Sequence, residues 1–180
     1  MSTTHDIRTP ALPGIRLRPP TIADAAAIHD LVVRSPPLDV NSLYAYLIWC
    51  RDFAATSVVA LDEDRLAGFV TGYRPPRDPD TYFAWQSAVD PALTRPGLAF
   101  AMMTEVAGRA RRAGARWFET TVNPGNRAVI MLIRKLARHH GGTPEVSTLF
   151  ESADLGGAHD PEVRYRFPLA ETGIEIREGG

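Results

Sequence analysis

The sequence contains only one cysteine, Cys50, in 180 residues. A single cysteine excludes an internal disulfide, and neither Cys-x-x-Cys nor His-Glu-x-x-His, two common metal-binding spacings, occurs. No apolar run approaches the roughly 18 residues that a membrane helix needs. Residues 1–14 also lack the apolar segment of a signal peptide. We therefore expect a cytoplasmic protein without a metal site.

The chain carries almost no net charge, −1 at neutral pH. A balance of this kind excludes a general electrostatic attraction to nucleic acid or to an anionic membrane. The composition is 44% hydrophobic and 23% charged, which is ordinary for a globular protein with a substantial core. Neither nucleic acid nor membrane is therefore expected as a partner.

Hydrophobic periodicity predicts the element order β-α-α-β-β-β-α-β-α-β-β. We expect a flexible arm over residues 1–14, one domain over 15–169 and a tail over 170–180. A helix between the predicted strands 81–89 and 116–122 allows one parallel crossover. The other pairs are expected to be antiparallel. The fold class is then α/β, with a mixed, mostly antiparallel sheet and helices on both faces.

A turn of small residues, "TRPGLA" over 94–99, separates the strand that ends at Val89 from a long helical pattern. The first N–H groups of a helix have no internal partner, and the helix dipole is positive there. Small residues let a phosphate group approach such a helix end closely. By spacing alone, an ordinary turn and a pyrophosphate site both remain open.

This strand, loop and helix, followed by a strand that ends in "TVNPGN" and a second helix, resembles the GCN5-related N-acetyltransferase (GNAT) family. The resemblance implies the GNAT fold and acetyl-CoA bound at a Q/R-x-x-G-x-G/A loop. Gly97 and Ala99 match this loop, whereas Thr94 replaces the usual Gln or Arg and Pro96 removes one N–H donor. The cofactor contacts implied by the resemblance are Ala88, Val89, Thr94, Arg95, Gly97, Leu98, Ala99, Asn123 and Asn126.

Three longer segments resemble the diaminobutyrate acetyltransferases of ectoine synthesis more closely: "PPLDVNSLYAYLIWC", "GFVTGYRPPRDPDTYFAWQSAVDP" and "HDPEVRYRF". This resemblance implies transfer of an acetyl group from acetyl-CoA to the γ-amine of L-2,4-diaminobutyrate, by direct attack in a ternary complex. The product is the ectoine precursor, and members of the family are usually cytoplasmic homodimers.

Asp39 is the first candidate for a contact with the amine, which has a pKa of about 10.4 and arrives as an ammonium. Its position before a helix favours a capping role when spacing is considered alone, but the resemblance implies a substrate contact. Trp85 is expected either to form a wall of the pocket or to be a core aromatic. Tyr44 and Tyr46 point to different helix faces, so at most one lines the pocket; Tyr44 is the candidate.

Three residues near the C-terminal end, Glu151, His159 and Glu162, are further candidates for substrate contacts. Surface charge is the ordinary role of such residues. The resemblance carried by "HDPE" implies contacts of His159 and Glu162 with the substrate, and of Glu151 with the ammonium.

Two catalytic roles are implied by the resemblance. A bulge near Ala88 and Val89 would splay the strand and free the Val89 N–H to stabilise an oxyanion. Asn126 matches an asparagine near the pantetheine arm and the leaving sulfur, although turn formation is the common role of such a residue. Ile133 occupies the position where many relatives carry a tyrosine that acts as the acid and protonates the leaving thiolate. Release of a thiolate with a pKa of about 8.5 is feasible without that acid.

Other functions remain open at this point. The domain could acetylate another small amine or a protein N-terminus. It could also bind acyl-CoA as a non-catalytic sensor, an alternative that the unusual residues Thr94 and Pro96 keep open. A structural module that binds no cofactor is the third alternative.

Overall fold

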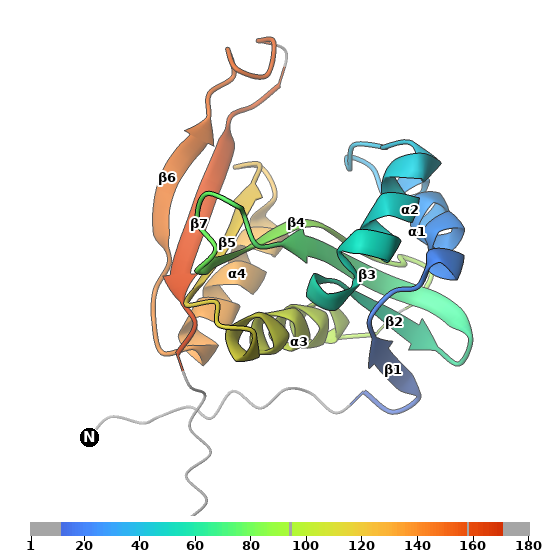
Figure 1. Ribbon diagram of the computed structural model, residues 1–180. Helices are drawn as coiled ribbons and strands as arrows, with labels where there is room; N and C mark the ends of the chain where they lie inside the picture. Colours follow the sequence, from blue (N-terminus) through green and yellow to red (C-terminus); the bar gives the residue numbers. More distant parts are fainter. Residues whose placement is uncertain (1–11, 94, 158, 171–180) are drawn as a thin grey trace, which may run out of the picture.

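The computed structural model describes residues 12–93, 95–157 and 159–170, and its centre is a seven-stranded sheet (Figure 1). The strand order is β1-β2-β3-β4-β5-β7-β6. Among the described strands, only the pair β4–β5 is parallel, as predicted. The strands are β1 Ile15–Arg18, β2 Val58–Asp62, β3 Arg65–Tyr73, β4 Thr81–Val89, β5 Trp117–Val122, β6 Glu145–Phe150 and β7 Glu162–Pro168.

Helices cover both faces of the sheet, which confirms the predicted fold class. They are α1 Ala25–Val33, α2 Leu43–Asp52, α3 Leu98–Arg112 and α4 Arg127–His139, with short 3-10 helices η1 Ile22–Asp24 and η2 Ala54–Thr56. On one face, Ile28 of α1 and Tyr46 of α2 pack with Phe69 of β3. On the other, Met102 of α3 and Leu136 of α4 belong to a larger core.

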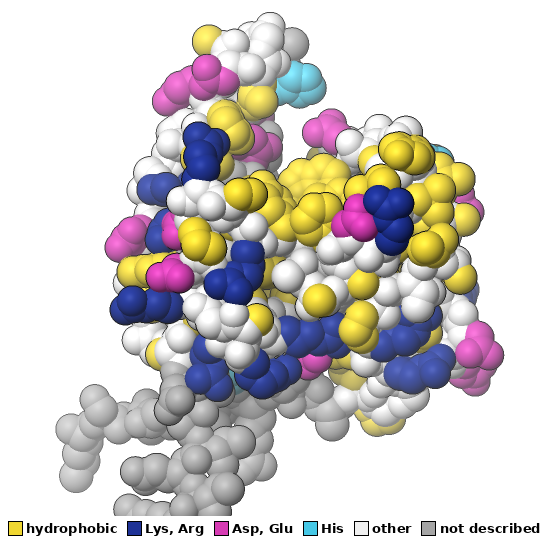
Figure 2. All heavy atoms as spheres, in the orientation of Figure 1, with side chains coloured by type: hydrophobic (Ala, Val, Ile, Leu, Met, Phe, Trp, Pro, Cys, Tyr) yellow, Lys and Arg dark blue, Asp and Glu magenta, His cyan; other side chains and the backbone are white. Residues whose placement is uncertain are grey.

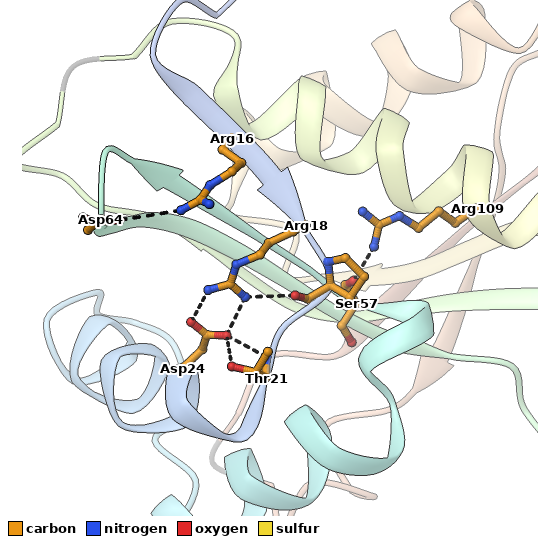
Figure 3. Close-up of polar contacts among 8 residues, drawn as sticks. Arg16, Arg18, Thr21, Asp24, Ser57, Asp64 and Arg109 are labelled. Carbon is orange, nitrogen blue, oxygen red and sulfur yellow. Dashed lines mark hydrogen bonds and ion pairs between the residues drawn. The ribbon is translucent and has the colours of Figure 1, made fainter.

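Local capping explains where the helices begin and end. The Thr21 N–H donates to the Asp24 carboxylate at 2.6 Å in a capping box, and the Ser42 hydroxyl accepts from the first turn of α2. Asp24 also forms a two-pronged ion pair with Arg18, which joins β1 to the start of α1 (Figure 3). Gly114, at φ 95°, follows α3 as expected for a helix C-terminus.

The parallel strands β4 and β5 pair over only part of their length. Their ladder runs from Thr81–Trp117 to Ala84–Thr120, where the Thr120 hydroxyl donates to the Ala84 carbonyl at 2.8 Å. The later residues of β4, 85–89, have no ladder with β5. This divergence leaves the carboxyl-terminal half of β4 open on the side that faces β5.

The bulge in β4 lies at Trp85, so the expected bulge near Ala88 and Val89 was wrong. The register shifts between Thr71–Gln86 and Gly72–Ala84, and Trp85 is the extra residue. Opposite the bulge, a Cβ on Gly72 would overlap the Tyr82 ring, so only glycine allows this close approach. An extra residue puts two successive side chains on one face, and Trp85 and Gln86 both contact α2.

Candidate active site

An aromatic cavity of about 230 Å³ lies on the α2 face of β4, at the point where β4 leaves β5. It is lined by Trp49, Phe53, Tyr73 and Trp85. Figure 2 shows a hollow between the arm formed by β6 and β7 and the pair α1–α2, with hydrophobic side chains at its base. Trp85 is 37% exposed, so it is a wall of this cavity and not a fully buried core aromatic.

Asp39 lies beside this wall because its backbone is bound to β4. The Gln86 side-chain amide donates to the Asp39 carbonyl at 2.9 Å, and Gln86 directly follows Trp85. Ser42 is the N-cap of α2, and Asp39 is therefore not the N-cap of that helix. The Asp39 side chain is exposed. The backbone of the 36–42 loop is thus held against β4 at the residue that follows Trp85.

The two tyrosines of α2 have opposite environments, as the helical spacing predicted. Tyr46 is buried and its hydroxyl donates to the Gln86 side chain at 2.9 Å. Tyr44 is 70% exposed on the surface of α2. Of the pair, Tyr46 is the residue bonded to β4, and the substrate contact of Tyr44 stays a prediction.

Val89 directs its backbone toward the open side of β4. The Asp90 N–H donates to the opposite residue, Ala67, at 2.8 Å, and hydrogen-bonded pairs alternate along antiparallel strands. The next pair, Gly68–Val89, is therefore a non-bonded pair, and the Val89 N–H points away from β3. Ala88, one residue earlier, pairs with β3 through its own backbone, so Val89 is the residue that offers a donor to the opening.

The loop from β4 to α3 ends at a helix N-terminus that a ligand can approach closely. Gly97 is the N-cap of α3 and has a left-handed backbone, with φ 87°. The Leu98 side chain is buried in the core, so only its backbone faces the turn. In the described part of the chain, the N–H groups of Ala99 and Phe100 have no backbone acceptor. These free donors and the helix dipole can hold an anion.

Arg95 has a partner within the protein. Its guanidinium binds the Asp62 carboxylate at the end of β2 at 2.6 Å, which ties the loop to the sheet. The Arg95 side chain remains 40% exposed. Thr94, the residue that replaces the usual Gln or Arg of the cofactor loop, lies outside the described residues.

Asp90, the residue that follows β4, anchors the same loop at its other end. Its carboxylate is fully buried and binds Arg65 at 2.8 Å, Arg34 at 3.4 Å and the Ala92 N–H at 2.9 Å. Burial raises the pKa of the Asp90 carboxyl, but these hydrogen bonds and charges outweigh burial, so the pKa lies below its usual value. The pairing partners are distant in sequence, and no local pattern indicated them.

The second cofactor element begins at a turn held by its own asparagines. Asn126 is the N-cap of α4 and accepts from the Val129 N–H at 3.2 Å. Asn123 accepts from Gly125 N–H at 2.8 Å and donates to the Asp160 carboxylate at 3.2 Å. The turn-forming roles considered from the sequence are therefore confirmed. Ile133 is buried in the core, so this position offers no acid.

The three C-terminal candidates for substrate contacts, two glutamates and a histidine, lie on the arm that stands across from α1 and α2 (Figure 1). Glu151 and His159 are exposed in the connection between β6 and β7, and Glu162 begins β7, opposite Phe150 of β6. The structure brings Asp39 and Trp85 together. It places the three candidates on a separate element that forms the opposite side of the hollow.

Cys50 is not suited to act as a nucleophile. The side chain is buried, and burial raises the pKa of its thiol to about 11, which keeps it protonated. Among the residues that the structure describes, no group of three or more His, Cys, Asp or Glu could hold a metal ion. In the same residues, no helix is long and apolar enough to span a membrane.

The comparisons with known proteins agree with this geometry. The acetyltransferase (GNAT) family profile matches residues 24–137. The L-2,4-diaminobutyric acid acetyltransferase of Streptomyces coelicolor is 42% identical over 169 residues, which cover 92% of this chain and 99% of that protein. The enzyme of the same name from Nocardia farcinica is 41% identical over 162 residues, covering 89% of this chain and 82% of that protein.

A solved structure is similar as well: the diaminobutyrate acetyltransferase EctA from Paenibacillus lautus, in complex with its substrate L-2,4-diaminobutyric acid and coenzyme A. It is 29% identical, with a TM-score of 0.81, and the match covers 86% of this chain and 94% of that one. This chain belongs to the acetyltransferase (GNAT) family and, within it, to the L-2,4-diaminobutyric acid acetyltransferases.

Proposed function

We propose that this protein transfers the acetyl group of acetyl-CoA to the γ-amino group of L-2,4-diaminobutyrate, giving the N-γ-acetyl product from which ectoine is made. The observation that carries this proposal is the P. lautus relative, which binds both diaminobutyrate and coenzyme A on the same fold. Two relatives, 41% and 42% identical over most of their length, bear the same activity in their names.

On the donor side, the start of α3 suits the diphosphate of coenzyme A. The Leu98 N–H donates to the Arg95 carbonyl, but among the described residues the next two N–H groups, of Ala99 and Phe100, have no backbone acceptor, and the left-handed glycine turn leaves room beside them. The proposed contacts are the backbone of Gly97, Leu98 and Ala99, with the exposed part of Arg95 adding positive charge. Acetyl-CoA, when bound there, supplies the activated acetyl group, and the residues of the protein orient it.

On the acceptor side, Asp39 would attract the ammonium group into the hollow. Trp85, stacked on Trp49, would pack against the short aliphatic chain of the substrate. Glu151, His159 and Glu162 would complete the pocket from the β6–β7 arm. Diaminobutyrate carries two amino groups, and acidic side chains on two opposed walls suit both of them.

The attack on the acetyl carbon requires a neutral amine and a stabilised carbonyl oxygen. Aromatic walls remove water from the ammonium, which lowers its pKa, whereas the Asp39 carboxylate holds the proton on the nitrogen. The proton therefore passes to a water at the exposed mouth of the hollow before the neutral amine attacks. The Val89 N–H points into the opening and can donate to the carbonyl oxygen as negative charge develops there. We propose that the amine attacks directly in a ternary complex, that Asn126 lies beside the pantetheine arm, and that the thiolate leaves without a tyrosine acid.

We also propose that the protein is a cytoplasmic homodimer, as the family resemblance implies. Val146 and Phe150 are exposed on β6, which forms an edge of the sheet, and an apolar edge of this kind suits an interface between copies. Light scattering after gel filtration measures this state directly.

The activity is tested by following thiol release from acetyl-CoA with diaminobutyrate, ornithine and lysine at equal concentration. We expect release with diaminobutyrate, with ornithine and lysine far slower, and the product acetylated at the γ-nitrogen by NMR. Equal rates with all three amines would refute the substrate and favour a general small-amine acetyltransferase. Binding of coenzyme A in a calorimeter without turnover of any amine would instead support the sensor alternative.

A further inference from the structure

Gln86 connects two elements that face the substrate hollow. Its side-chain carbonyl accepts from the Tyr46 hydroxyl of α2 at 2.9 Å. Its side-chain N–H donates to the backbone carbonyl of Asp39 in the 36–42 loop, also at 2.9 Å. Gln86 is only 8% exposed. The buried amide therefore has a partner at each end, one on a helix and one on a loop.

The bulge at Trp85 makes this connection possible. In a regular strand, the residue after Trp85 would point to the opposite face of the sheet, toward α3 and α4. Because Trp85 is the extra residue, Gln86 points to the same face as Trp85 itself. The wall of the hollow and the side chain that holds the loop are thus consecutive residues.

The loop has few other fixed contacts at Asp39. Among the described residues, the Asp39 carbonyl also accepts from the Asn41 side chain, but at the long distance of 3.5 Å. The bond from Gln86 is shorter, is partly buried and spans a separation of 47 residues. It is the contact that fixes the Asp39 backbone relative to β4.

We propose that Gln86 is a positioning residue for the acceptor amine, acting through Asp39 and held in place by Tyr46. It sets the distance from the Asp39 carboxylate to the wall formed by Trp85, and it does so without touching the substrate. This inference rests on the proposed function, since Asp39 is assigned there to the ammonium. Gln86 therefore governs the affinity for diaminobutyrate and leaves the affinity for acetyl-CoA unchanged.

The test is Gln86→Leu, which keeps the side-chain size and removes both hydrogen bonds. We expect KM for diaminobutyrate to rise about tenfold, the effect of losing a buried hydrogen bond to a substrate-binding group. KM for acetyl-CoA should stay within about twofold of the wild-type value, since the α3 turn is held by other contacts. Tyr46→Phe should change KM for diaminobutyrate in the same direction but less, because the bond to Asp39 remains.

Thr71→Val is the matched control. Thr71 is buried, like Gln86, and its hydroxyl donates to the backbone carbonyl of Gln86 at 3.2 Å; among the described residues it makes no bond to the 36–42 loop. Its loss should lower stability and leave both KM values unchanged. Equal rises in KM for both substrates, or an effect of Thr71→Val equal to that of Gln86→Leu, would overturn the positioning role. Tyr46→Phe provides the same comparison if Gln86→Leu does not fold.

Amide hydrogen exchange separates this inference from the activity itself. The peptide that covers residues 38–45 should exchange faster in Gln86→Leu than in the wild type, and should be unchanged in Thr71→Val. Unchanged exchange in Gln86→Leu would refute the connection even in an active enzyme. Faster exchange in a protein that does not acetylate diaminobutyrate would keep the connection and refute the proposed function alone.

Discussion

Trp49 of α2 stacks on Trp85 of β4, with ring centroids 4.8 Å apart and an angle of 12° between the planes. One indole comes from a helix and the other from the bulged residue of a strand. Trp49 also contacts Phe53 and Tyr73, so Trp85 is supported from behind by a cluster of rings. The orientation of the proposed substrate wall thus depends on a residue that sequence reasoning did not select.

Replacing Trp49 with alanine should therefore disturb the acceptor side first. Loss of the stack leaves Trp85 free to rotate, and aromatic pairs contribute about 0.5–1.5 kcal/mol beyond the area that they bury. We expect KM for diaminobutyrate to rise more than KM for acetyl-CoA, and the near-UV circular dichroism of the tryptophans to weaken. Trp49→Phe should restore most of both signals. A change confined to acetyl-CoA would contradict this arrangement.

Gly97→Ala should weaken the donor side. The φ of 87° at Gly97 is left-handed, and a Cβ in that region costs roughly 1–2 kcal/mol. We expect a loss of stability of that size in urea unfolding, with weaker binding of coenzyme A by calorimetry.

Gly108 offers a matched glycine in the same helix. A Cβ at Gly108 would meet only the end of the Arg112 side chain, at 3.4 Å, and the residue is in the helix interior. Alanine there should stabilise α3 by up to about 1 kcal/mol. Its binding of coenzyme A should equal that of the wild type; equal weakening in both variants would remove the special role of the turn.

Asp90→Asn should destabilise the fold in a pH-dependent way. The folded-state pKa of Asp90 is lowered, so its contribution is present above the unfolded pKa of about 3.9 and is lost as pH falls through the folded value. We expect the difference in unfolding free energy between wild type and variant to be about 1–2 kcal/mol at pH 7. The difference should shrink below about pH 4. A difference that grows on acidification would show that Asp90 is not ionised in the folded state.

Substitutions at Asn126 distinguish a cap from a cofactor contact. Asn126→Ala removes the acceptor for the Val129 N–H and should cost about 1 kcal/mol of stability. Asn126→Asp keeps the acceptor and adds a charge that is favourable at a helix N-terminus. If the amide N–H of Asn126 contacts the pantetheine arm, Asn126→Asp regains the stability but not kcat/KM for acetyl-CoA. Full recovery of both would limit Asn126 to capping.

Asp39→Asn should raise KM for diaminobutyrate tenfold or more, since a charge-assisted hydrogen bond to the ammonium is lost. Asp64→Asn is the control, because Asp64 is exposed in the β2–β3 turn and pairs with Arg16 only at 3.7 Å (Figure 3). Steady-state kinetics on both variants gives the answer. An unchanged KM in Asp39→Asn would move the ammonium contact to the β6–β7 arm.

Much of the fold followed from short-range signals in the sequence. The strands alternate, the helices repeat their apolar residues every three or four positions, and caps such as Ser42 and Gly114 lie within a few residues of the groups that they bind. Family motifs then indicated the acetyl donor and the acceptor. These features are readable because the interacting residues are close together along the chain.

The tertiary structure alone decided the details that hold the site in place. The bulge lies at Trp85 and not near Ala88 and Val89, where the sequence led us to expect it. Asp90 pairs with Arg34, 56 residues away, and Gln86 binds Asp39, 47 residues away. Strand register and buried polar pairing depend on which distant groups meet when both cores close. Each buried donor and acceptor must find a partner at that moment, and no local pattern encodes which one it will be.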